Sequence, residues 1–231
     1  KEEGPPPGWR RWRHHLLLGA AGWMAATSVL SLSRGGAVVA LVCMLALTWI
    51  FWAGWRAHTA LVRLGFLGFL AACGAVGLWL GGEPLKKRFE ALDEGLLQRE
   101  SMYQTARQIA EDFPWYGTGP GTLGPVFQLY RKGMEEYWPA QLHNDWLEIR
   151  VTWGRVGMGL LLLALGLVVI RIFLPGAVPT SWRLPLTLWL ALGGCLLHAR
   201  WDFPLQVYSI QQLFIFHCAV LACLSHRRWW A

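Results

Sequence analysis

Six long apolar blocks dominate this sequence and constrain its fold more than any other feature. They cover residues 16–32, 37–55, 64–80, 156–174, 184–197 and 205–224. A helix that crosses a bilayer needs about 20 apolar residues, with a range of roughly 17–25. Five blocks meet this requirement, and the block at 184–197 meets it only if its ends extend. We therefore predict an all-α integral membrane protein with about six transmembrane helices.

Composition favours a membrane protein and argues against a nucleic-acid partner. Charged residues make up 15% of the chain, against about 25% in soluble domains. The net charge of +7 suggests nucleic acid at first, but the basic residues mostly flank the apolar blocks, as they do on the cytoplasmic side of membrane proteins. The five cysteines lie inside apolar blocks without a CxxC pair, so neither a disulfide framework nor a metal framework is expected.

The distribution of arginine predicts an orientation and a domain organisation. If the N-terminus is cytoplasmic, every short loop on that side carries at least two arginines, as the positive-inside rule requires. A cytoplasmic segment at 1–15 is then followed by three transmembrane helices within 16–80, an outer loop at 81–155, three transmembrane helices within 156–224 and a cytoplasmic tail at 225–231. The outer loop holds 11 of the 14 acidic residues, which is typical of a water-facing domain.

The outer loop is predicted to be mainly helical. A helix is expected over residues 96–112, because Arg99, Tyr103 and Arg107 recur about one turn apart and Pro114 ends it. The run at 117–121 predicts a turn, since it lacks the Gly-Lys-Ser/Thr sequence and the strand context of a phosphate-binding loop. Further helices are expected at 123–132 and from about Asn144, the latter running into the next span.

His143 is the strongest candidate for a chemical role in the loop. Asn144 or Asp145 can cap a helix, which places His143 just before the positive end of that helix. This end disfavours imidazolium, and a neutral imidazole can act as a general base. The alternative is an ordinary surface histidine beside a cap. A metal site is not expected, because the loop contains neither an HExxH sequence nor a second histidine.

Two arginines are candidates for binding an anion. Arg34 lies at the outer end of the first span, as either an interfacial anchor or an anion site, since guanidinium binds phosphate through two parallel hydrogen bonds. Arg99 either belongs to such a site or is a solvated charge paired with Glu100. Three polar residues at the outer ends of the last two spans either pair with one another or line the site: His198, Arg200 and Asp202.

The order of these features resembles the C-terminal half of the O-antigen ligase/polymerase family. Ser-Arg-Gly-Gly at 33–36 ends one span, and two spans later the outer loop contains Arg99. The loop then carries Asp-Phe-Pro-Trp-Tyr-Gly-Thr-Gly-Pro-Gly at 112–121 and Leu-His-Asn-Asp-Trp-Leu-Glu at 142–148. A span that begins Gly-Arg-Val-Gly at 154–157 closes the loop. The resemblance covers nearly all of residues 16–224, and these sequences are fairly specific in combination.

The resemblance implies a GT-C-like fold in the bacterial inner membrane, with the outer loop periplasmic and catalytic. It implies transfer of a glycan from an undecaprenyl diphosphate carrier to a hydroxyl acceptor, such as lipid A core, another glycan or a protein, without a metal, nucleotide sugar or other cofactor. His143 would be the general base, and Arg34 and Arg99 would bind the diphosphate. Three further residues are expected to contribute to substrate binding: Asn144, Glu148 and Arg200.

A transporter or a non-catalytic polysaccharide export protein is the alternative function. An ion-coupled transporter predicts charged residues in the middle of its spans. Within the six apolar blocks the only charged residue is Arg171, near the end of the fourth, which argues against an ion pathway. Members of the family usually have about twice as many spans. The chain is therefore expected to be a fragment that lacks an N-terminal half and is inactive alone.

Overall fold

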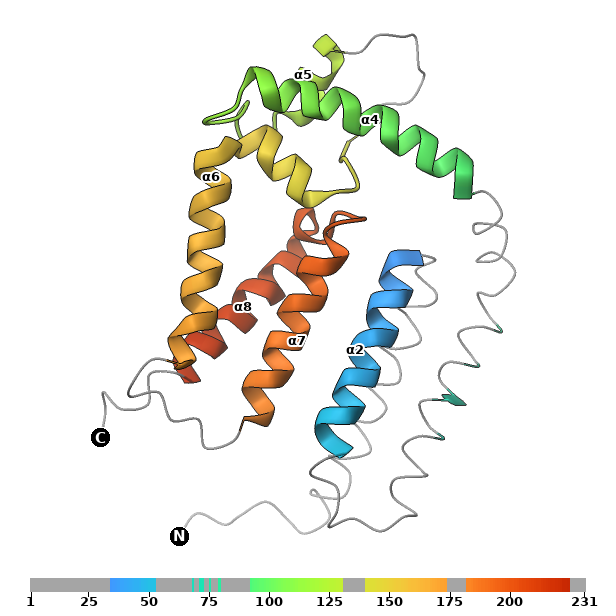
Figure 1. Ribbon diagram of the computed structural model, residues 1–231, viewed down its shortest axis with the longest axis vertical. Coiled ribbons are helices and arrows are strands. Elements are labelled where there is room, and N and C mark those ends of the chain that lie inside the picture. Colours follow the sequence, from blue (N-terminus) through green and yellow to red (C-terminus); the bar gives the residue numbers. More distant parts are fainter. Residues whose placement is uncertain are drawn as a thin grey trace.

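The described part of the chain is helical. The computed structural model describes residues 34–52, 92–130, 140–173 and 182–224, with a few single residues between 68 and 79. Its α-helices are α2 (Arg34–Trp52), α4 (Leu92–Asp112), α5 (Leu123–Tyr130), α6 (Asp145–Ile170), α7 (Arg183–His198) and α8 (Tyr208–Leu224), and 3-10 turns follow at Arg171–Phe173 and Pro204–Gln206 (Figure 1). No strand occurs within these ranges, which confirms the all-α prediction for them.

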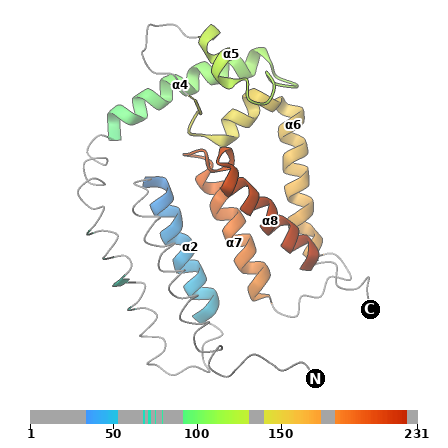
Figure 2. The same ribbon diagram turned by 180° about the vertical axis from the view of Figure 1, so that it is seen from behind.

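The helices form two layers. Helices α4 and α5 lie across the ends of α2, α6, α7 and α8, as both views show (Figures 1 and 2). Helices α2 and α7 approach closely, because a Cβ added at Gly194 would lie 2.7 Å from the Sγ of Cys43. Helices α7 and α8 pack through Leu188, Leu192 and Leu221. We call α4, α5 and the first turns of α6 the outer layer.

Among the described helices, α6 is the one long and apolar enough to cross a membrane. Its apolar part follows Gly154, and large side chains such as Leu160 and Leu167 are more than half exposed there. These side chains suit contact with lipid, because their exposure to water would cost free energy. Shorter apolar stretches lie in α2, α7 and α8. The predicted spans at 16–32 and, for most of its length, 64–80 lie outside the described residues, so the number six stays a prediction.

A small apolar core holds the outer layer together. Met102, Ala106 and Ile109 share one face of α4 and are buried. The rest of this core comes from α4, from α5 and from residues on either side of the start of α6: Ala110, Leu123, Phe127, Leu142 and Val151. Helix α4 begins four residues before its predicted start, and α5 is described to Tyr130, because residues 131–139 lie outside the described ranges.

The Gly-rich turn (residues 114–121) docks against a kink in α6. At the kink, two hydrogen bonds within α6 are replaced by hydrogen bonds between α6 and the turn. The N–H groups of Thr118 and Gly119 donate to the carbonyls of Val151 and Thr152 at 2.9 Å. The N–H groups of Arg155 and Val156 donate to the carbonyls of Pro114 and Trp115, at 2.9 and 3.0 Å. The backbone groups that the kink frees are therefore satisfied.

Two glycines permit this docking. Gly154 has a φ of 66° and ψ of −166° inside α6, and a Cβ there would lie 2.4 Å from the carbonyl oxygen of Trp115. Gly117 has a φ of 68°, and a Cβ there would lie 2.4 Å from the backbone of Thr152. The prediction of a turn is confirmed. The helix from Asn144 does run toward the apolar segment as predicted, but it bends at Gly154 instead of continuing straight.

Candidate functional site

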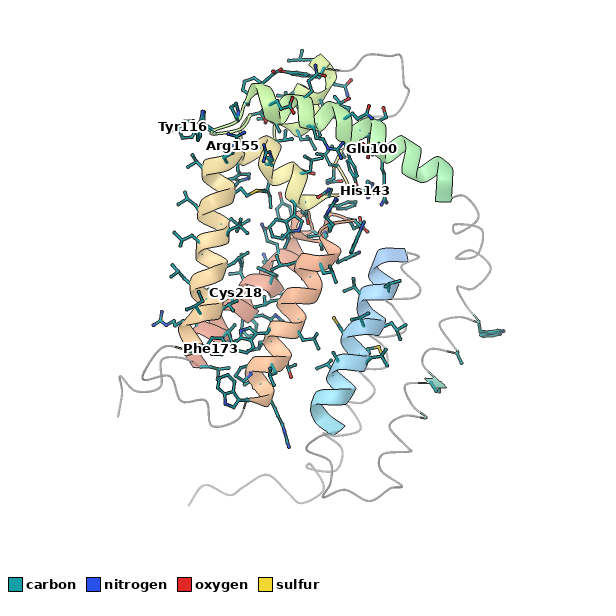
Figure 3. The ribbon with its side chains drawn as sticks, viewed as in Figure 1. Glu100, Tyr116, His143, Arg155, Phe173 and Cys218 are labelled. Atoms are coloured by element: carbon teal, nitrogen blue, oxygen red, sulfur yellow. The ribbon has the colours of Figure 1, made fainter. Side chains whose placement is uncertain are left out.

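His143 immediately precedes α6, as the sequence predicts. Asn144 is the N-cap, and its side-chain oxygen accepts a hydrogen bond from the N–H of Leu147 at 3.2 Å. His143 itself has a φ of 51°, the left-handed region. Figure 3 shows its side chain between the outer layer and the end of α7.

Asp202 joins His143 to His198. The Nδ1 of His143 lies 3.1 Å from one carboxylate oxygen of Asp202, and the Nε2 of His198 lies 3.5 Å from the other. The N–H of Phe203 donates to the first oxygen at 3.1 Å, and the Phe203 ring meets the His143 ring edge-on at 4.8 Å between centroids. Of the three residues that the sequence left as either pairing or lining the site, His198 and Asp202 therefore pair, and His143 also joins Asp202.

The environment of Asp202 keeps its carboxylate ionised. Partial burial acts to raise the pKa of Asp202, but hydrogen bonds from His143, His198 and the Phe203 N–H hold this pKa well below its usual range. A neutral imidazole next to this carboxylate carries its proton on Nδ1 and donates it to Asp202. The lone pair is then on Nε2 of His143, and that nitrogen can accept a proton from a substrate.

Arg99 lies beside the same connection between α7 and α8. Its guanidinium donates to the carbonyl of Trp201 at 3.0 Å, one residue before Asp202. The alternative that Arg99 pairs with Glu100 is not what the structure shows, because Glu100 forms its ion pair with Arg107 at 2.8 Å. Two turns of α4 place those two side chains on one exposed face.

Arg34 is the first residue of α2, and its side chain lies outside the described residues. Its neighbour Gly35 is close to the site, since a Cβ there would lie 3.6 Å from the His198 ring and 3.7 Å from Trp201. Arg200 follows α7 and is exposed. Its charge acts to lower the pKa of Tyr103, although burial raises that pKa overall. The roles of both arginines stay predictions.

Asn144 and Glu148 are both buried, with 5% and 7% of their surfaces exposed. Asn144 caps α6, and a carboxylate oxygen of Glu148 accepts the N–H of Leu142 at 3.1 Å. Burial raises the pKa of Glu148, and that hydrogen bond opposes the rise. These two side chains therefore bond to the protein's own backbone, and substrate binding by them stays a prediction.

Two further polar residues bond to the site, and the local sequence did not predict either bond. Tyr103 donates its hydroxyl to the carbonyl of His143 at 3.0 Å. Asp145 is fully buried, and one carboxylate oxygen accepts the N–H of Leu205 at 2.8 Å. Burial raises the pKa of Asp145 to about 6, against the hydrogen bonds from Leu205 and Gln206. The sequence predicted a polar residue, Asn144 or Asp145, at the start of the helix. It did not predict the bond from Asp145 to Leu205, which lies 60 residues later.

Within the described ranges no group of three or more His, Cys, Asp or Glu side chains is arranged to hold a metal ion. The two histidines that meet Asp202 are suited to moving a proton, and the guanidinium of Arg99 nearby is suited to binding an anion.

Comparison with known families gives a match that covers most of the chain. The family model described as O-antigen ligase matches residues 19–164. Searches of curated proteins and of solved structures gave no significant match. The matched range begins in the first predicted span, includes the outer layer and His143, and ends in α6.

Proposed function

Because this chain belongs to the O-antigen ligase family, we propose that it transfers a glycan from an undecaprenyl diphosphate carrier to a hydroxyl acceptor. The observation that carries this proposal is the pairing of His143 with the ionised Asp202 at 3.1 Å. An imidazole oriented by a carboxylate is a suitable base for a hydroxyl. The acceptor is lipid A core, a growing glycan or a protein hydroxyl.

The proposed step needs one base and a cation beside the leaving group. The acceptor oxygen forms a bond to the anomeric carbon, and its proton passes to Nε2 of His143. The bond from that carbon to the diphosphate breaks, and the electron pair leaves with the diphosphate. Asp202 stabilises the imidazolium that forms. Arg99 and Arg34 stabilise the charge on the leaving diphosphate, because positioned cations are most effective where charge develops.

The site is proposed to face the periplasm from the inner membrane. The expected boundaries are those of the sequence: transmembrane helices within 16–80 and 156–224 around the outer loop at 81–155. The far end of α6 supports this orientation. Phe173 stacks with Trp189 at 5.1 Å and with Trp182 at 6.0 Å between centroids, and Arg183 lies beside them in sequence. Aromatic residues are typical of either membrane interface, and basic residues are typical of the cytoplasmic one. Figure 3 shows Phe173 at the far end of α6 from His143.

The test is transfer in reconstituted vesicles, with the protein in its full-length form and an undecaprenyl-diphosphate glycan as donor. His143→Ala is expected to lower the rate about 10²–10⁴-fold, the usual contribution of a general base. His217→Ala is the matched control, since His217 lies on α8 and bonds the carbonyl of Leu213. Full activity of His143→Ala would show that His143 is not the base. If the wild type transferred glycan to none of the acceptor classes, the proposed function would be wrong.

A further inference from the structure

The backbone conformation of His143 is unusual within the described ranges. His143 is the non-glycine residue there with a positive φ, at 51°. An L side chain reaches this left-handed region at a cost, and such residues persist where the surrounding structure holds them. The residues on both sides are deeply buried, since Leu142 and Asp145 are fully buried and Asn144 is 5% exposed. The chain must therefore turn sharply at a residue whose imidazole meets Asp202.

Two side chains hold the backbone on either side of this turn. Glu148, from the first turn of α6, accepts the N–H of Leu142 at 3.1 Å. Tyr103, from α4, donates to the carbonyl of His143 at 3.0 Å. The Tyr103 bond therefore fixes the peptide unit between His143 and Asn144, and the Glu148 bond fixes the peptide unit between Gln141 and Leu142, one unit before the peptide that joins Leu142 to His143. The two side chains come from different helices, so the turn is tied to both.

We propose that Glu148 and Tyr103 are positioning residues that hold His143 in the left-handed conformation in which its imidazole meets Asp202. We call these two bonds the clamp. The clamp matters for catalysis only if His143 is the base, so the proposal rests on the function proposed above. Without the clamp, His143 relaxes toward ordinary backbone conformations, and only a fraction of the molecules keeps the ring on Asp202.

The chemistry of both side chains suits positioning. Glu148 is 7% exposed and its carboxylate already accepts a backbone N–H, so little of it is open to a substrate. Burial raises the pKa of Tyr103, which keeps the phenol protonated and able to donate. A phenol that donates to a main-chain carbonyl uses its only proton in that bond.

The kinetic test distinguishes a positioning role of the two bonds from direct contact of Tyr103 or Glu148 with substrate. Tyr103→Phe and Glu148→Leu each remove one bond, and each should lower kcat about 10- to 100-fold with KM for the donor unchanged. Glu148→Gln keeps an oxygen that accepts the Leu142 N–H and should retain most of kcat. Tyr130→Phe and Glu111→Leu are the controls, because Tyr130 bonds Asp112 on the exposed side of the outer layer and Glu111 is exposed.

Two kinetic outcomes would overturn the clamp. If Glu148→Gln loses as much activity as Glu148→Leu, the charge of Glu148 acts directly in the reaction. If Tyr103→Phe raises KM and leaves kcat unchanged, Tyr103 binds substrate. Tyr103→Phe removes one oxygen atom and keeps the test valid even if Glu148→Leu does not fold.

A melting comparison tests the clamp without any activity. Gly adopts a positive φ more readily than Ala, so His143→Gly should melt at a higher temperature than His143→Ala. In the Tyr103→Phe background this advantage should shrink, because position 143 is then free to relax. Equal melting temperatures, or an advantage unchanged by Tyr103→Phe, would overturn the clamp. Failure of the wild type to transfer glycan would overturn only the proposed function.

Discussion

Asp202 is the residue at which distant parts of the chain meet. It lies between His143, which precedes α6, and His198, at the end of α7, while Gly35 at the start of α2 lies against His198. A partly buried carboxylate is costly unless it is hydrogen-bonded, and here donors come from two rings and one backbone N–H. The same bonds that make this charge tolerable orient the imidazole of His143.

Asp145 should make stability depend on pH. Its pKa is raised from 3.8 to about 6 by burial, so the folded chain binds this proton more tightly than the unfolded chain. Its contribution is therefore full below pH 3.8 and is lost as the pH rises through about 6, a change of about 3 kcal/mol at most. Asp145→Asn imitates the protonated form, so its melting temperature relative to wild type should rise between pH 4 and 7. A difference that does not vary with pH would contradict this origin.

At the scale of elements, the Gly-rich turn and the kink in α6 form one unit. Its four backbone hydrogen bonds join residues 114–119 to 151–156. The unit sets the angle between the polar start of α6, which follows His143 and the N-cap Asn144, and the apolar remainder of the helix. The site is thus positioned by a backbone junction as well as by side chains.

Gly154→Ala should disrupt this junction. The new Cβ would meet the carbonyl of Trp115 at 2.4 Å and would stand at a φ of 66°, so the destabilisation should be on the order of 3 kcal/mol. Gly159→Ala is the control, because a Cβ at Gly159 meets nothing within 4 Å. Thermal unfolding in detergent measures both. Equal melting temperatures for the two variants would show that the junction tolerates a side chain.

The sequence predicted local elements better than their meeting points. Helical spacing and Pro114 predicted the helix that ends at Asp112, and the cap at Asn144 was predicted from residue type alone. The bend at Gly154 was not predicted, because it depends on a turn more than 30 residues earlier. The bond between His143 and Asp202 spans 59 positions. Of the two alternatives for Arg99, pairing with Glu100 was wrong, because helix geometry offers Glu100 a partner two turns away.

At the scale of the whole molecule, Figure 1 shows the outer layer at one end of the apolar bundle and the end of α6 and start of α7 at the other. Phe173, Trp182 and Trp189, which lie after α6 and around the start of α7, cluster at that other end. The apolar part of α6 at residues 156–170, together with its 3-10 extension to Phe173, has 18 residues. At 1.5 Å per residue this is about 27 Å, close to the hydrocarbon thickness of a bilayer, about 30 Å. Both ends therefore fit the two interfaces of one membrane.

The orientation of this bundle can be measured with single cysteines in a variant whose native cysteines are replaced. Arg107→Cys, on the exposed face of α4, should react with an impermeant maleimide added to intact spheroplasts. Arg183→Cys should react only after permeabilisation, because its end of the bundle is expected to be cytoplasmic. The reverse pattern would place the outer layer in the cytoplasm and would exclude a periplasmic site.

The most direct test of the central claim, that His143 and Asp202 act together as the base, is a double-mutant cycle on kcat for glycan transfer. His143→Ala, Asp202→Asn and the double variant are compared with wild type in vesicles. Residues that act as a unit are not additive, so the double variant should be no slower than His143→Ala alone. Losses that multiply would contradict the claim, because each residue would then contribute without the other.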